Sequence, residues 1–92
     1  MNIELNVTEL LTTARALRES ASEAYADERM NTAVCEYRLA GRYYDLLGNK
    51  PRSTHCYQMA KAIEQEIAAI AAGEDDEAAY LAKTTASYSR SV

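Results

Sequence analysis

Residues 37–60 read YRLAGRYYDLLGNKPRSTHCYQMA. Tyr37 and Tyr44 flank Gly41 at steps of four and three residues, which places all three on one face of a helix. Gly48 then permits a left-handed turn, and Tyr57 follows in the next helical segment. Because Gly41 has no side chain, we predict that Tyr57 lies against the backbone at that point and that two antiparallel helices form a tight hairpin.

The same stretch contains a longer motif of small and aromatic residues: Tyr37, Ala40, Gly41, Tyr44, Gly48, Ser53, Tyr57 and Ala60. The motif resembles one tetratricopeptide repeat, the helix-turn-helix unit of protein-binding solenoids. Tyr37 stands where that family usually has Trp, and Ala40 stands where it has Leu. No second copy follows at the offset of about 34 residues that such arrays use. The resemblance therefore implies a single protein-binding hairpin, limited to residues 37–60.

The composition favours a small all-α domain. The chain has 92 residues, and 17 of its apolar residues are Ala while Phe and Trp are absent. Such a core is thin, so the helices must pack closely or recruit a second chain. We predict a small antiparallel bundle of three to four helices within residues 1–83, followed by a flexible Ser/Thr-rich tail over residues 84–92.

Periodicity and capping signals locate the helices. Asn6 is a candidate N-cap for a helix over residues 7–26, and residues 27–31 interrupt its apolar stripe. A second helix is expected to end near residue 47, and a third is expected over residues 53–72, where Gly73 would end it. A short fourth helix would begin at residue 74. Residues 1–7 alternate in polarity, which fits either a short strand or a lead-in.

The second predicted helix has a second apolar stripe, formed by Cys35, Leu39, Tyr43 and Leu46. This stripe cannot face the third helix while Tyr37, Gly41 and Tyr44 do so. It is therefore either covered by the first helix or free to bind a partner or a second copy of the chain.

Two basic residues accompany this stripe. The first helix of a tetratricopeptide unit lines the ligand groove, and some members hold an acidic peptide end there with basic residues one turn apart. The resemblance thus implies a partner-binding set of Arg38, Leu39, Arg42, Tyr43 and Leu46. The alternative is that Arg38 and Arg42 cover helix surface and pair with acids of the bundle.

Charge is divided along the chain. Residues 1–28 hold six acids and two bases, residues 29–61 hold six bases and two acids, and residues 62–92 hold six acids and two bases. The basic middle segment is interleaved with tyrosines, a mixture that could bind an anionic ligand or nucleic acid. The net charge of −4 and the acidic ends oppose capture of DNA. Nucleic acid is thus the weaker alternative.

Residues able to perform chemistry are few. His55 is the only histidine, and its neighbour Cys56 would point about 100° away from it on a helix. We therefore expect no enzymatic activity, no cofactor and no metal site. Cys35 and Cys56 are expected to be buried, reduced thiols. No apolar run is long enough for a membrane span, so a cytoplasmic protein is expected.

These observations favour a small non-enzymatic adaptor or inhibitor that binds another protein. The alternatives are the binder of an anionic ligand or nucleic acid, and an inhibitor of the type that phages encode against host enzymes or defence proteins. The sequence does not identify the partner.

Overall fold

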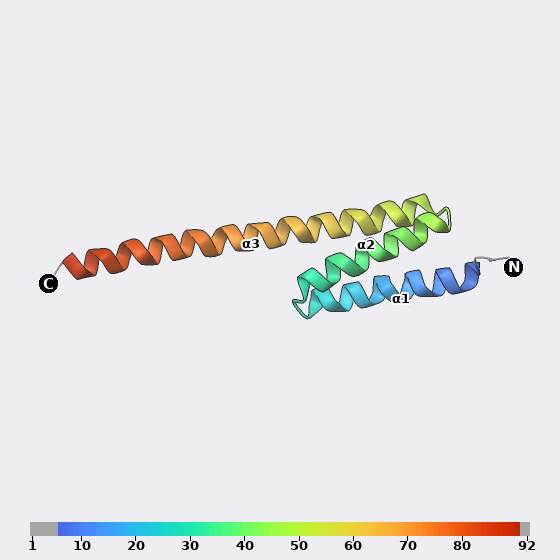
Figure 1. The fold of residues 1–92 in the computed structure, drawn as a ribbon, viewed down its shortest axis with the longest axis horizontal. Coiled ribbons are helices and arrows are strands. Elements are labelled where there is room, and N and C mark those ends of the chain that lie inside the picture. Colours follow the sequence, from blue (N-terminus) through green and yellow to red (C-terminus); the bar gives the residue numbers. More distant parts are fainter. Residues whose placement is uncertain (1–5, 91–92) are drawn as a thin grey trace, which may run out of the picture.

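The computed structural model describes residues 6–90, with side chains for residues 6–74, and these residues form three α-helices and no strand. Helix α1 spans Val7–Ala26, α2 spans Met30–Leu46 and α3 spans Lys50–Arg90. Helix α2 lies between α1 and α3 and packs against both (Figure 1). The prediction of an all-α fold of packed helices is confirmed. The predicted strand or lead-in falls largely on residues 1–5, which lie outside the described residues.

The core is made largely of alanine. Ala14, Ala21 and Ala24 of α1 face Ala33, Ala40 and neighbouring residues of α2, and all five are fully buried. Alanine side chains let helix backbones approach closely. The larger buried side chains are Val34, Tyr37, Tyr44, Cys56 and Ile63. Helices α1 and α3 are also joined directly, because the Tyr25 hydroxyl donates a hydrogen bond of 2.7 Å to Glu66.

The close approach of α2 and α3 depends on Gly41. A Cβ atom at this position would lie 3.0 Å from two ring atoms of Tyr57, so the ring occupies the space that a side chain would need. Tyr44 and Tyr37, to either side, are 0% and 5% exposed. The predicted contact between Tyr57 and Gly41 is therefore present, although Tyr57 keeps 37% of its surface exposed.

Two turns of the same form connect the three helices. After α1, the N–H of Arg29 donates to the carbonyl of Ala24, and after α2 the N–H of Asn49 donates to the carbonyl of Tyr44. Each turn contains one residue in the left-handed region, Glu28 at φ 63° and Gly48 at φ 73°. The second turn thus repeats the first after 20 residues. Glycine tolerates this conformation, whereas glutamate is strained in it.

A carboxylate at the end of α2 holds the start of α3. Asp45 accepts hydrogen bonds from the hydroxyls of Ser53 and Tyr57, the latter at 3.2 Å. Lys50 lies 4.0 Å from the same carboxylate. The Ser53 hydrogen bond is the main reason that the pKa of Asp45 is lowered. Because these groups come from both helices, they fix the hairpin geometry at its closed end.

Helix α3 is much longer than predicted. It continues through Gly73 to Arg90, so the prediction that Gly73 ends a third helix and that a separate helix follows is wrong. A single glycine costs about 1 kcal/mol in a helix interior, and the surrounding Ala and Glu residues are good helix formers. Residues 84–90 belong to the helix, residues 91–92 lie outside the described residues, and the flexibility of residues 84–92 stays a prediction.

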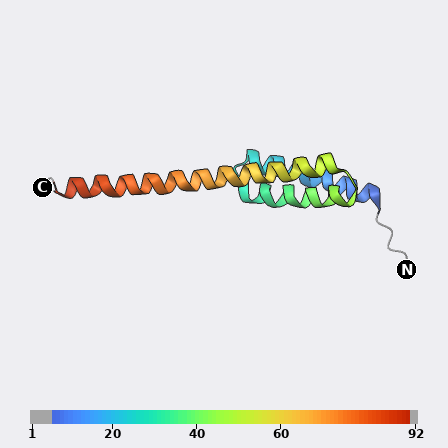
Figure 2. The same ribbon diagram turned by 90° about the horizontal axis from the view of Figure 1, so that it is seen from above.

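The length of α3 determines the shape of the molecule, which measures 79 × 24 × 20 Å. The C-terminal half of α3 extends past α1 and α2 in both views (Figures 1 and 2). None of the helices within the described residues combines the length and the apolar character needed to cross a membrane.

Candidate interaction surface

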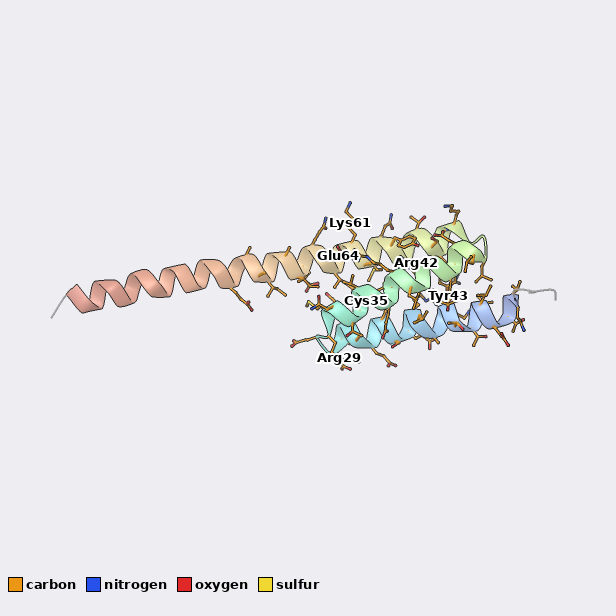
Figure 3. All side chains as sticks on the ribbon, in the orientation of Figure 1. Arg29, Cys35, Arg42, Tyr43, Lys61 and Glu64 are labelled. Atoms are coloured by element: carbon orange, nitrogen blue, oxygen red, sulfur yellow. The ribbon has the colours of Figure 1, made fainter. Side chains whose placement is uncertain are left out.

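One side of α2 is left uncovered by α1 and α3. Cys35 is exposed, and Leu39 and Leu46 are 42% and 61% exposed. These residues recur at steps of four and seven along α2 and therefore share one face. We call this surface the α2 face, made of Cys35, Arg38, Leu39, Arg42 and Leu46. Figure 3 shows Cys35 and Arg42 on α2 and Glu64 on the adjacent α3.

The α2 face contains a shallow groove of about 270 Å³, lined by Cys35, Arg38, Leu39 and Arg42. The structure thus brings together three of the five predicted partner-binding residues. Leu46 is exposed but does not line the groove. Tyr43 is half-buried and packs against the core, so it belongs to the fold more than to the surface.

The two arginines of the groove differ in their environment. Arg38 forms an ion pair with Glu64 of α3, as the alternative interpretation of the sequence expected. Arg42 is exposed and has no ion-pair partner among residues 6–74. Leu39 supplies apolar surface between them. The groove therefore offers one uncommitted positive charge beside an exposed leucine.

Cys35 lines the groove, although the sequence analysis predicted that it is buried. Both cysteines are free thiols, but Cys35 is exposed whereas Cys56 is fully buried. The prediction that Cys35 is buried is wrong, because α1 packs against a different side of α2. Its spacing of three and four residues from Arg38 and Leu39 was the sequence signal for its place in the groove.

His55 and Cys56, neighbours in sequence, differ in their exposure. His55 is exposed while Cys56 is buried, so the two side chains do not form a pair. Burial raises the pKa of the Cys56 thiol, which disfavours the reactive thiolate. Within residues 6–74, no group of three or more His, Cys, Asp or Glu side chains is arranged to hold a metal ion.

The tyrosines of the basic segment are mostly structural. Tyr37 and Tyr44 are buried and cannot stack on a ligand, and the Tyr57 ring lies against Gly41. The guanidinium of Arg52 lies 5.9 Å from the centre of the Tyr44 ring, a cation–π contact within the fold. Tyr37 and Tyr44, two of the tyrosines interleaved with the bases, are therefore not available for stacking on a ligand.

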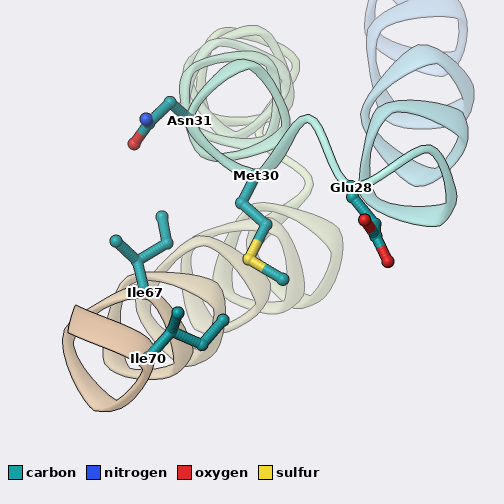
Figure 4. A pocket seen from close by; sticks show the side chains of 5 residues that line it. All are labelled: Glu28, Met30, Asn31, Ile67 and Ile70. Atoms are coloured by element: carbon teal, nitrogen blue, oxygen red, sulfur yellow. The ribbon is translucent and has the colours of Figure 1, made fainter. Parts of the chain in front are cut away.

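A second hollow, missed in the sequence, lies where α3 leaves the bundle. It has a volume of about 410 Å³ and is lined by Glu28, Met30, Asn31, Ile67 and Ile70 (Figure 4). Ile67 and Ile70 continue the apolar stripe of α3 past the start of α2. The sequence signal for this hollow was the length of the apolar stripe on the third predicted helix, which extends past the start of the second predicted helix.

The chain matches no protein-family model, and neither a curated protein nor a solved structure is detectably similar to it.

Proposed function

We propose that the protein is a small non-enzymatic interaction module, an adaptor or inhibitor, that binds another protein through the α2 face. The observation that carries this proposal is the groove lined by Cys35, Arg38, Leu39 and Arg42. Leu39 and Leu46 remain 42% and 61% exposed on this face. Exposed leucines lower the solubility of a protein, and a bound partner would cover them.

The hairpin of α2 and α3 is, in this proposal, a single tetratricopeptide-like unit. Its support is the contact of Tyr57 with Gly41 and the burial of Tyr37 and Tyr44. In the family that the motif resembles, the first helix of the unit lines the ligand groove. The corresponding helix here is α2, which carries the groove.

The groove favours a partner segment with an apolar side chain next to a carboxylate. Leu39 would contact the apolar side chain, and Arg42, which lacks an ion-pair partner among residues 6–74, would bind the carboxylate. Arg38 is held by Glu64 and contributes less. Arginine is among the residue types that most often dominate the binding energy of protein interfaces.

Cys35 allows the proposal to be tested in the groove itself. The sequence has two cysteines, and Cys56 is 0% exposed, so a maleimide photocrosslinker is expected to attach only to Cys35 in the native protein. Illumination in an extract of the native host should attach a specific protein to the chain, and mass spectrometry would identify it. The Cys35→Ser variant must give no product.

Two matched variants decide whether the α2 face is responsible. Leu39→Asp should abolish the crosslink, because it places a charge in the apolar part of the groove. Ala16→Asp adds the same charge at an exposed position of α1 and should leave the crosslink intact. Equal yields from both variants would contradict the proposal, and a product destroyed by nuclease would favour the nucleic-acid alternative.

A further inference from the structure

The apolar stripe of α3 loses its cover as the helix leaves the bundle. Cys56, Ala60 and Ile63 are at most 2% exposed. Ile67, one turn further, is half-buried, and Ile70 is 45% exposed. The exposure of the stripe therefore rises over Ile67 and Ile70, where α1 ends and α2 begins.

The hollow at this point marks where the cover stops. Met30, at the start of α2, lies near Ile67 and Ile70, and the three side chains border an open space of about 410 Å³ (Figure 4). Residues 71–90, which we call the α3 extension, follow directly. No other helix of the described chain lies beside this extension in either view (Figures 1 and 2).

An uncovered helix of this kind has little to hold it. Most of the stability of a helix in a protein comes from packing of an apolar face, and isolated helices of 12–15 residues are marginal in water. The α3 extension has 20 residues, which corresponds to about 30 Å of helix. A partner of about this length is needed to cover it and Ile70 together.

We propose that a second copy of this chain covers the α3 extension, with the two extensions paired antiparallel. The charge order along the extension supports this arrangement. Residues 74–77 are four consecutive acids, and the two bases of the extension, Lys83 and Arg90, come after them. An antiparallel pair sets residues 74–77 of each copy beside residues 83–90 of the other, whereas a parallel pair sets like charges together.

The same arrangement also occupies the hollow. Antiparallel extensions of equal length bring the C-terminal end of each α3 to the point where the other α3 leaves its bundle. Ile70, Ile67 and Met30 lie at that point. A paired region of about 30 Å is a small interface, so we expect the dimer to dissociate at micromolar concentration.

Sedimentation velocity of the full-length chain across the micromolar range provides the first test. The parent should shift from monomer to dimer with rising concentration, and Ile70→Asp should raise the dissociation constant about tenfold or more. Gln65→Asp adds the same charge at an exposed position of α3, two residues from both Ile63 and Ile67 and hence on the opposite side. It should leave the dissociation constant unchanged.

The orientation of the pair is tested by exchanging charges. Lys83→Glu with Arg90→Glu should weaken the dimer about tenfold at low salt. Adding Asp75→Lys and Asp76→Lys to the same chain should restore the dimer, because antiparallel pairing again opposes unlike charges.

Circular dichroism melts of every variant establish that the bundle is folded. A parent that stays monomeric throughout, or equal effects of Ile70→Asp and Gln65→Asp, would overturn the proposal. A charge exchange that does not restore the dimer would overturn the antiparallel arrangement. Because Leu39→Asp lies outside this interface, loss of its effect on partner crosslinking would count against the proposed function alone.

Discussion

At Gly41 the absence of a side chain sets the distance between α2 and α3. The Tyr57 ring fills the space, and its hydroxyl donates to Asp45, so the ring cannot move away without losing that hydrogen bond. The contact between α2 and α3 at this point thus depends on a glycine and on the tyrosine ring that covers it. Sequence reasoning could find this pair because both lie within one local motif.

A larger residue at position 41 should force the hairpin apart. Gly41→Leu is expected to lower the free energy of unfolding by about 1–3 kcal/mol through overpacking. The control is Ala16→Leu, at an exposed position of α1, which should change stability by less than about 0.5 kcal/mol. Urea unfolding measures both. A Gly41→Leu variant as stable as the parent would show that the Tyr57 ring moves freely.

The two related turns make a pair of opposite predictions. Glu28→Gly should stabilise the protein by about 0.5–1 kcal/mol, because it relieves a left-handed glutamate at φ 63°. Gly48→Ala should destabilise it by about 1 kcal/mol, because it places a Cβ atom at φ 73°. Thermal melts of the two variants should therefore shift in opposite directions, and shifts of the same sign would contradict the shared turn geometry.

Asp45 should make stability depend on pH in the acid range. Its folded-state pKa is lowered from 3.8, mainly by the Ser53 hydrogen bond, so the ionised form is favoured by folding. The resulting stabilisation is present above about pH 4 and is lost as the pH falls through the lower, folded-state pKa. The melting temperature should thus fall less between about pH 6 and pH 2.5 in Asp45→Asn than in the parent. Equal falls would show that Asp45 is not involved.

At the scale of the helices, the start of α1 was predicted correctly from neighbouring residues. Asn6 accepts hydrogen bonds from the backbone N–H groups of Thr8 and Glu9, at 3.1 and 3.3 Å, which is why α1 begins where its cap predicts. Exposure that depends on residues distant in the sequence could not be predicted from the sequence. The exposure of Cys35 depends on which side of α2 receives α1, and periodicity alone does not specify that side.

Gly73 shows a different limit of the sequence. A glycine after a run of alanines is a common helix end, yet here α3 continues through it. The partner-binding prediction met a similar limit, since Arg38, Leu39 and Arg42 share a groove while Tyr43 packs inward. The spacing of the four residues predicted that they share one side of α2. Which of them is exposed and which is packed inward is decided by the neighbouring helices.

The continuity of α3 can be measured at Gly73. Apart from its own turn of helix, no described atom lies within 4 Å of a Cβ placed at Gly73, and its φ is not left-handed. Gly73→Ala should therefore increase the helical signal at 222 nm, by favouring the helix by about 1 kcal/mol. A left-handed glycine ending a helix would give the reverse, a loss of signal and of stability.

For the whole molecule, the long helix dominates the dimensions. The radius of gyration of 20.7 Å exceeds the value of about 12 Å expected for a compact chain of this length. The packed helices thus lie at one end of the molecule, and α3 extends beyond them (Figure 1).

Small-angle X-ray scattering of the Ile70→Asp variant should give a radius of gyration near 20.7 Å, because that variant is expected to be monomeric. The parent at high concentration should give a larger value. A radius close to the compact value of about 12 Å would mean that α3 folds back on the bundle in solution.

The two turns that repeat after 20 residues raise the question of whether a further helix could pack on α3 as α3 packs on α2. Ala33, Tyr37 and Ala40 of α2 have their counterparts 20 residues later in Ser53, Tyr57 and Ala60 of α3. The Tyr57 ring of α3 lies against Gly41 of α2. The residue 20 positions after Gly41 is Lys61, which is exposed. A lysine side chain at this position would occupy the space that the tyrosine ring fills at Gly41, so a further helix could not pack on α3 through the same contact. In the described part of the chain, α3 thus carries an exposed lysine at the position equivalent to the glycine of α2 that accommodates Tyr57.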